Sequence, residues 1–397
     1  MVDVATLLTV FIAALASLFM AWSIGAGSSG STPFAPAVGA NAISVMRAGF
    51  LVGLLGFAGA VLQGANVSEA VGRELISGVT LSGEAAAIGL LTAATLVAIG
   101  VFTGYPIATA FTVTGAIVGV GLALGGDPAW AKYAEITTLW VLTPFVGGGI
   151  AYGTARLLRA EGVPERYTVP LLAAIVGLML ANIEFALLGP SGVGRSVAEH
   201  ASIALDSPAL GGVDLGLVAT TLAFALVCGA LVGRDMRRDP VGAQRRFLLA
   251  MGGLVAFSAG GSQVGLAIGP LLPLLDPFEI SLTAVLVGGG IGLLAGSWTG
   301  APRMIKAIAQ DYSSLGPRRS IAALIPSFAI AQTAVLFGIP VSFNEIIVSA
   351  VVGAGYAAAG GGVSKAKMGY TVLAWVGSLV LSIVLGYGIL TLAFALF

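Results

Sequence analysis

Long apolar segments follow one another along almost the whole sequence, and this succession limits the fold more than any other feature. About 20 apolar residues in a helix cross the hydrocarbon core of a bilayer. Twelve segments of about that length lie near 5–25, 45–64, 84–102, 106–126, 136–158, 168–189, 212–233, 246–262, 280–298, 320–337, 340–360 and 368–396. Only 9% of the 397 residues are charged, against about 25% in soluble domains. We predict an all-α integral membrane protein of about twelve transmembrane helices.

The first apolar segment runs into a stretch that a lipid-facing helix would not contain. Gly25–Ser31 consists only of Gly, Ala and Ser, and Thr32 and Pro33 follow. Glycine costs about 1 kcal/mol in a helix interior, and non-helical backbone at membrane depth is tolerated only inside protein or beside a wet cavity. A similar run, Ser258–Gly265, returns later. We predict two broken helices, with re-entrant hairpins near 27–44 and 260–277.

The two runs belong to an internal repeat. At a nearly constant spacing along the sequence, the matched pairs are Ala21 with Ala256, Ser23 with Ser258, Gly25 with Gly260, Gly104 with Gly338, Pro106 with Pro340, and Trp140 with Trp375. Seven predicted spans separate equivalent points, so the halves should have opposite orientation. We expect a first inverted repeat over 1–165, connecting spans with a basic loop over 166–245, and a second repeat over 246–397. Such repeats place the substrate where their broken helices meet.

The distribution of basic residues predicts the orientation in the membrane. With twelve spans and both termini outside, 15 of the 18 Lys and Arg residues fall on the inside, the side that positive charge favours. Only Arg73, Lys132 and Arg195 then lie outside. If 106–126 and 340–360 were re-entrant instead, the inside count would drop to 13. The expected location is therefore the cell membrane, in a multi-pass arrangement.

Polar side chains at the breaks are the candidates for binding a substrate. Helices that start after such breaks direct free N–H groups and a positive dipole end at the cavity, which suits a small anion. The candidates are Ser28, Ser29, Ser31, Thr32, Ser262 and Gln263, with Thr109 and Ser342 from two Gly-x-Pro turns. The structural alternative is that small residues allow close helix packing and that the hydroxyls cap turns.

Carboxylates within predicted spans are few, and they are candidates for a coupling cation. Glu345 lies about five residues into its span and Glu184 near the end of another. Charged groups inside a membrane are costly and usually functional, although both could lie near enough to the outer surface to be solvated. Ser23 and Ser258, which occupy equivalent positions in the two runs, are further candidates.

The sequence gives little support for a metal site, an enzyme or a nucleic-acid-binding protein. A single histidine, His200, and a single cysteine, Cys228, exclude a helical H-E-x-x-H metal site and a cysteine metal cage. No nucleophile–base pair can be assembled, so we do not expect an enzyme or a cofactor. Eighteen basic and eighteen acidic residues cancel, and no basic surface for nucleic acid is expected.

Taken together, these elements resemble the inorganic phosphate transporter (PiT) family of secondary transporters. The family carries a duplicated G-A-N-D-V-A-N motif, to which Gly25–Ser31 and Gly260–Leu266 are similar. Its G-x-P-V-S-T-T-H element is similar to Gly104–Phe111 and Gly338–Glu345. The departures fall on informative positions, because the two motif aspartates are replaced by Ser28 and Gln263 and the histidine by Phe111 and Glu345.

The resemblance implies a secondary transporter of a small inorganic oxyanion, phosphate first, working by alternating access in the bilayer. Sulfate or another oxyanion, or an anion-binding membrane protein that does not transport, are the alternatives. Symport with sodium or with protons is left open, because neutral Ser28 and Gln263 cannot balance a cation's charge as carboxylates do. A homodimer is a candidate assembly.

Overall fold

The computed structural model describes residues 4–189, 194–357 and 363–396, and it is almost entirely helical. The first part holds α1 (Val4–Gly27), α2 (Ala35–Gly39), α3 (Val45–Gln63), α4 (Ala65–Arg73), α5 (Gly83–Thr103), α6 (Thr109–Ala123) and α7 (Trp130–Leu157). The middle holds α8 (Glu165–Ala181), α9 (Val197–Ala204) and α10 (Leu215–Arg238). The last part holds α11 (Pro240–Ile268), α12 (Leu272–Leu275), α13 (Leu282–Thr299), α14 (Ala301–Asp311), α15 (Pro317–Leu336), α16 (Phe343–Tyr356) and α17 (Lys365–Leu396).

Short strands and tight turns close the loops at the helix ends. Three antiparallel pairs join β1 (Ile76–Ser77) to β2 (Asp127–Pro128), β3 (Glu184–Phe185) to β4 (Arg195–Ser196), and β5 (Ala209–Leu210) to β6 (Val213–Asp214). Two 3-10 turns, η1 (Gly269–Leu271) and η2 (Asp276–Phe278), flank α12. The predicted span 168–189 therefore ends at Ala181, because the chain beyond it turns into the β3–β4 hairpin.

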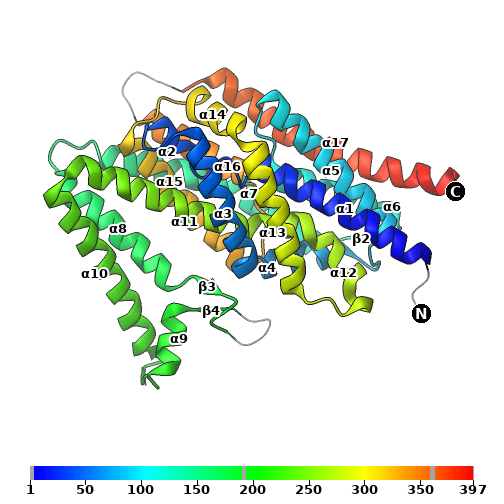
Figure 1. The fold of residues 1–397 in the computed structure, drawn as a ribbon, viewed down its shortest axis with the longest axis horizontal. Coiled ribbons are helices and arrows are strands. Elements are labelled where there is room, and N and C mark those ends of the chain that lie inside the picture. Colours follow the sequence, from blue (N-terminus) through cyan, green and yellow to red (C-terminus); the bar gives the residue numbers. More distant parts are fainter. Residues whose placement is uncertain (1–3, 190–193, 358–362, 397) are drawn as a thin grey trace.

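The helices confirm a multi-pass membrane protein. Within the described residues, nine helices are long and apolar enough to cross a bilayer, and α6 and α16 are shorter apolar helices. Helix α8, with 17 residues, packs along α10. In Figure 1, α8, α9 and α10 form an arm at the lower left, away from the end of the molecule that carries both termini.

The helices of the last part repeat the order of the first part. Helices α7 and α17 start at Trp130 and Lys365, and this is the spacing that separates Ala21 from Ala256 in the sequence repeat. Packing repeats as well, since α1 packs against α5 and α13 while α11 packs against α15 and α3. The second set begins with α11 at Pro240, ahead of the predicted boundary at 246.

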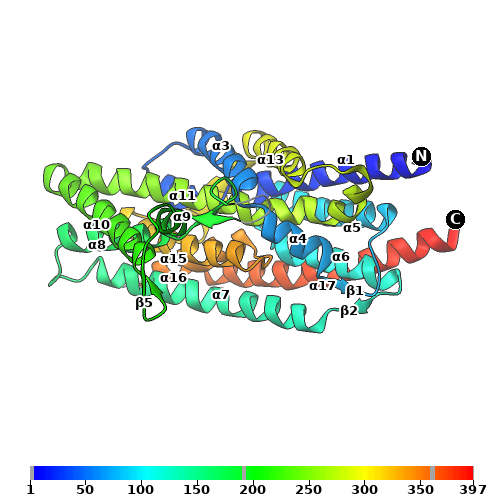
Figure 2. The same ribbon diagram turned by 90° about the horizontal axis from the view of Figure 1, so that it is seen from below.

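The two sets of helices are interlocked. Helix α7 of the first set packs against α16 of the second, and α17 packs against α6; α7 and α17 run along the lower side of the molecule in Figure 2. The Trp140 indole N–H donates to the Pro340 carbonyl at 2.8 Å, and the Trp375 indole N–H donates to the Pro106 carbonyl at 2.7 Å. A tryptophan of each set therefore hydrogen-bonds the Gly-x-Pro turn of the other set.

Only the first of the two predicted helix breaks is present. Helix α1 ends at Gly27, and turns over Ser28–Phe34 lead to the short α2. The expected break in Ser258–Gly265 is wrong, because α11 continues through Ile268, and the expected hairpin over 260–277 is a helical run to Phe278. The glycines there serve close packing: a Cβ at Gly260 would lie 1.9 Å from the Gly56 carbonyl oxygen of α3.

The segments predicted as full spans over 106–126 and 340–360 contain only short helices. Helices α6 and α16 have 15 and 14 residues, about 22 Å of helix against a hydrocarbon core of about 30 Å. Each follows a left-handed glycine, Gly104 (φ 77°) or Gly338 (φ 62°), and a short stretch outside regular structure. Thr109 and Phe343, their first residues, are fully buried, so both helices start inside the molecule.

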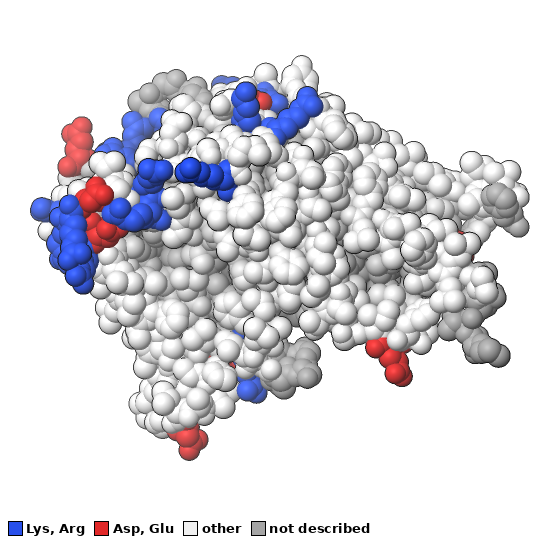
Figure 3. All heavy atoms as spheres, viewed as in Figure 1, with Lys and Arg blue, Asp and Glu red and all other residues white. Residues whose placement is uncertain are grey.

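Charged and apolar surfaces are segregated. On the face shown in Figure 3, most Lys and Arg side chains gather at the upper left, and the wide middle carries almost no charge. Both termini lie at the opposite end, on the right of Figure 1. Apolar side chains on α10 and α17, such as Leu226 and Leu373, are exposed, as expected for helices that face lipid.

Candidate functional site

The end of α1 and the middle of α11 meet in a buried polar cluster. Ser28, the first residue after α1, donates its hydroxyl to the Gln263 side-chain oxygen at 3.3 Å, and Thr109 donates to the same oxygen at 2.7 Å. The hydroxyls of Ser28 and Thr109 are 3.4 Å apart. All three side chains are fully buried. We call Ser28, Thr109 and Gln263 the central cluster.

The central cluster joins equivalent positions of the two repeats. Ser28 and Gln263 have the same spacing in the sequence as the first residues of α7 and α17. Gln263 completes its hydrogen bonds by donating its side-chain amide to the Val341 carbonyl at 2.5 Å. The cluster therefore connects α11 to the break after α1 and to both Gly-x-Pro segments.

The start of α16 brings further polar atoms to the same place. Asn344 donates its amide to the carbonyls of Gly27, at 2.9 Å, and Ile107, at 2.6 Å. Its side-chain oxygen, the Ser342 hydroxyl and one Glu345 carboxylate oxygen are buried without a hydrogen-bond partner among the described residues. Such groups are costly to bury unless something satisfies them. All three atoms can therefore bind a cation or accept hydrogen bonds from a substrate, and the carboxylate oxygen of Glu345 can also accept a proton.

The backbone N–H groups in the first turns of α6 and α16 are also available to bind a ligand. The first turn of a helix leaves backbone N–H groups without helical partners, and neither helix has a side-chain cap there. Because Asn344 near the start of α16 reaches Ile107, two residues before α6, the two helix starts are close together. Positive dipole ends from both helices then favour an anion between them.

Several predicted site residues instead hold the local structure. Ser31 and Thr32 donate their hydroxyls to the Ser28 carbonyl at 3.0 and 3.1 Å, and so stabilise the turn after α1. Ser262 donates weakly to the Ala259 carbonyl, one turn back in α11, at 3.4 Å. Ser29 is buried beside them. A substrate role for these four residues stays a prediction.

The coupling-ion candidates lie in different environments. Ser23 donates to the Ala94 carbonyl and so ties α1 to α5. Ser258 donates to the Leu254 carbonyl of its own helix and accepts a hydrogen bond from the Gln332 amide at 2.6 Å. Glu184 lies in β3, where loss of solvent and then the charge of Glu199 raise the pKa of its carboxyl group. Of these four candidates, only Glu345 directly follows a residue that hydrogen-bonds the end of α1, since Asn344 donates to the Gly27 carbonyl.

A separate cavity of about 420 Å³ lies where the ends of α3, α8 and α15 approach the start of α13. Its polar lining includes Gln63, Asn182, Glu184 and Gln332. Gln332 hydrogen-bonds both Gln63 and Ser258, and Ser258 lies five residues before Gln263 in α11. Sequence reasoning missed Gln63 and Gln332, because neither lies in a repeated motif. Asn344 lies within the second Gly-x-Pro element, Gly338–Glu345, but it is not among the candidates chosen from the sequence.

The described side chains offer a cation few charged ligands. Within residues 4–189, 194–357 and 363–396, no three His, Cys, Asp or Glu side chains form a group suited to a metal ion. A cation at the central cluster would therefore be held by hydroxyl, amide and carbonyl oxygens, with Glu345 as the nearby carboxylate. Such oxygen ligands suit hard cations such as sodium.

Comparison with known proteins gives a consistent result. The model of the phosphate transporter family matches residues 24–386. The "Inorganic phosphate transporter 2-1, chloroplastic" of Arabidopsis thaliana is 24% identical over 382 residues, which cover 86% of this chain and 65% of that protein. A protein of Chlamydia trachomatis named as a candidate phosphate permease is 27% identical over 379 residues, which cover 85% of this chain and 87% of that one.

A solved structure has the same fold. It is titled "The sodium-dependent phosphate transporter", and it aligns with a TM-score of 0.81 at 21% sequence identity, covering 98% of this chain and 100% of that one. A candidate phosphate permease of Thermococcus kodakarensis, 24% identical, is matched over 90% of both chains. The names of these relatives refer to phosphate and not to sulfate.

Proposed function

The chain belongs to the phosphate transporter family, and from this premise we propose that it carries inorganic phosphate across a membrane by alternating access. The proposal rests on the central cluster, where Ser28 and Gln263 of the two repeats meet beside Thr109. Binding between repeats lets a rocking of one against the other expose the same site to either side. This is transport and not enzymatic chemistry.

The architecture we propose is twelve crossings in two inverted repeats. Besides the nine long helices, α8 would cross together with its flanking residues, and α6 and α16 would cross with the segments that lead into them. Seven crossings, α1, α3, α5, α6, α7, α8 and α10, would then precede α11, which reverses its orientation relative to α1. The basic end in Figure 3 supports a cytoplasmic side there, with both termini outside and the cell membrane as location.

Phosphate would be recognised by donors that converge on the central cluster. The Thr109 and Ser28 hydroxyls and the Gln263 amide can each turn a hydrogen bond from its present partner to a phosphate oxygen. Free N–H groups at the starts of α6 and α16 add donors without adding charge. Hydrogen bonds to a charged partner are about twice as strong as neutral ones, so the exchange favours the ligand. Transport would break the direct contact between Ser28 and Gln263.

A coupling cation bound beside Ser342, Asn344 and Glu345 would provide a partner for their unpartnered oxygens. Glu345 is 2% exposed and forms no ion pair with any described residue. A buried carboxylate without a partner is costly, and a sodium ion or a proton bound there would remove that cost while offsetting the charge of phosphate. The choice between sodium and proton symport stays open, as does a homodimer as the assembly.

Uptake of radiolabelled phosphate into proteoliposomes tests the function. We expect saturable uptake that a sodium gradient or a pH gradient accelerates. Thr109→Val keeps the shape of the side chain and removes the donor to Gln263, so we expect its KM for phosphate to rise about tenfold or more. Thr138→Val is the matched control, because Thr138 is exposed on α7 and bonds only its own helix at Ala134.

The outcomes separate the function from the site. Absence of saturable uptake by the wild type under every gradient would refute phosphate transport. Uptake by Thr109→Val equal to that of Thr138→Val would keep the function but refute the central cluster as the site. Unfolding temperatures of both variants within a few degrees of the wild type show that a loss reflects binding and not folding.

A further inference from the structure

A second cavity, which is basic, lies away from the central cluster, at the turn that joins α10 to α11. It has a volume of about 440 Å³. The last two turns of α10 and the first three of α11 form its walls. Leu231, Val232, Arg234, Asp235, Arg238, Ala243, Arg246, Phe247 and Ala250 line it. Guanidinium groups and apolar side chains therefore share one cavity.

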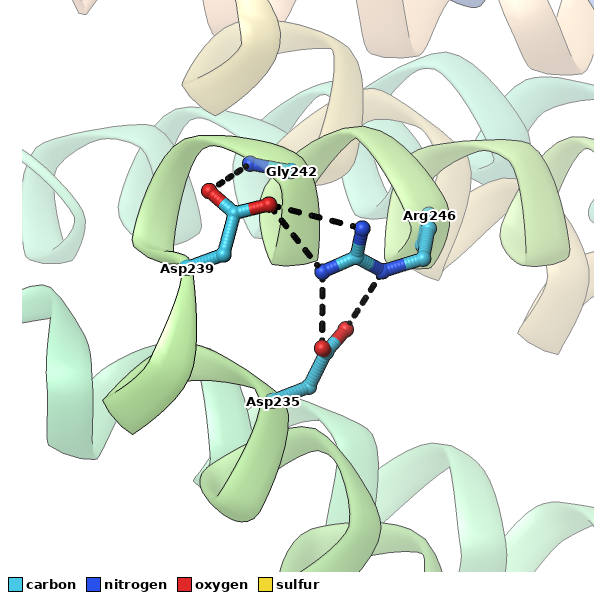
Figure 4. A network of polar contacts seen from close by, with 4 residues as sticks. All are labelled: Asp235, Asp239, Gly242 and Arg246. Atoms are coloured by element: carbon cyan, nitrogen blue, oxygen red, sulfur yellow. Dashed lines mark hydrogen bonds and ion pairs between the residues drawn. The ribbon is translucent and has the colours of Figure 1, made fainter.

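One of its three arginines is neutralised within the protein (Figure 4). Arg246 binds both carboxylate oxygens of Asp235 at 2.7 Å and approaches Asp239 at 3.4 Å. Asp239 also accepts the Gly242 backbone N–H at 3.0 Å, so it caps the start of α11. The two nearby carboxylates are thus bound to Arg246 and to the start of α11, and neither forms an ion pair with Arg234 or Arg238.

The other two arginines keep their charge available. Arg234 and Arg238 are four residues apart in α10, so they lie on the same face of the helix, and both line the cavity. Both are exposed, and neither forms a hydrogen bond or an ion pair within the described part of the chain. Residues 234–246 contain five Arg against two Asp, which leaves an excess of positive charge at this turn.

Apolar surface continues from the arginines along α10. Leu231 and Phe247 form part of the wall of the cavity. Val227, four residues before Leu231 and so on the same face of α10, is 55% exposed. Leu222 and Leu226, farther round the helix, are 53% and 73% exposed. In a membrane this face contacts acyl chains. A ligand that fits has an anionic head at Arg234 and Arg238 and a long apolar tail along α10.

We propose that this cavity binds an anionic glycerophospholipid from the cytoplasmic leaflet. Arginine binds phosphate oxygens in paired hydrogen bonds, and basic pockets between transmembrane helices hold anionic lipid headgroups. Free phosphate would leave the apolar wall uncovered. A second copy of the chain across a two-fold axis would bring its own excess of arginines against these, which is unfavourable. The site is independent of the transport site.

Native mass spectrometry of the purified full chain, with added phosphatidylglycerol or phosphatidylcholine, tests the proposal. We expect the wild type to retain phosphatidylglycerol and Arg234→Gln/Arg238→Gln to bind it about tenfold more weakly or worse, since each arginine near a membrane surface contributes to binding anionic lipid. Arg237→Gln is the matched control, because Arg237 is exposed on the same turn but does not line the cavity. It should bind like the wild type.

Three results would overturn the proposal. Equal binding of phosphatidylglycerol by the wild type and the double variant would show that the lipid binds elsewhere. Displacement of the lipid by millimolar glycerol phosphate, which has the headgroup charge without the tails, would identify a site for free anions. Conversion of a dimeric wild type to a monomer in the double variant would identify the surface as a contact between copies. Each readout is independent of phosphate uptake.

Discussion

At the scale of single residues, the two positions where the motif aspartates are replaced still face each other. Ser28 and Gln263 share a hydrogen bond, and Thr109 joins them. A pair of facing carboxylates would need a cation to relieve their repulsion, whereas a hydroxyl and an amide satisfy each other. The three side chains therefore satisfy one another without an ion in the state described, and in our proposal Glu345 supplies the charge for coupling.

Glu345→Gln tests that role, because glutamine has the same shape and no charge. We expect the accelerating effect of the sodium or pH gradient on uptake to fall about tenfold or more, as removal of a buried charged interaction is costly. Exchange of labelled for unlabelled phosphate without a gradient should persist. Both activities are measured in the same proteoliposomes. Gradient-driven uptake equal to that of the wild type would exclude Glu345 as the coupling group.

At the scale of elements, glycines explain both a correct and a wrong prediction. Composition alone made Gly25–Ser31 and Ser258–Gly265 look alike, and the first does end a helix. In the second, Gly260 packs on the Gly56 carbonyl and Gly265 on the Ser68 backbone N–H group of α4, so that α11 approaches α3 and α4 closely. Glycine in a helix can mark either a break or a close contact, and only the neighbouring helix decides which.

Gly260→Ala measures that contact directly. The new Cβ would lie 1.9 Å from the Gly56 oxygen, so α11 and α3 must separate, and we expect the unfolding temperature to fall by several degrees. Gly288→Ala, in α13 with no atom within 4 Å of the new Cβ, is the control and should be neutral or slightly stabilising, because alanine favours helix by about 1 kcal/mol. Thermal unfolding in detergent measures both. Equal midpoints would refute close packing as the role of Gly260.

Much of the architecture could be predicted from the order of apolar segments and from the constant spacing of the repeat. That spacing places α17 relative to α7 and identifies Ser28 with Gln263. It could not reveal which residues the repeated tryptophans contact, since Trp140 binds Pro340 and Trp375 binds Pro106 only after the halves interlock. Nor could it reveal the polar cavity at Gln63 and Gln332, which lie outside the repeated motifs. Long-range contacts of this kind leave no local pattern.

At the scale of the whole molecule, the two repeats enclose the central cluster from both sides. Helix α7 packs against α16, and α17 packs against α6. Each of the helices that begin at the site, α6 and α16, is therefore packed against a helix of the opposite repeat. A movement of α7 or α17 would therefore shift the start of α16 or α6, where Asn344 and Thr109 lie. Alternating access could use this coupling to open the site to one side while closing it to the other.

In the proposed function, phosphate binds between the repeats at Ser28, Thr109 and Gln263. A structure determined with phosphate in a lipid environment tests this most directly. We expect tetrahedral density within hydrogen-bonding distance of the Thr109 hydroxyl and the Gln263 amide, with Ser28 and Gln263 no longer in direct contact. In Gln263→Leu we expect no such density. Phosphate bound only in the cavity lined by Gln63 and Gln332, with the central cluster unchanged, would contradict it.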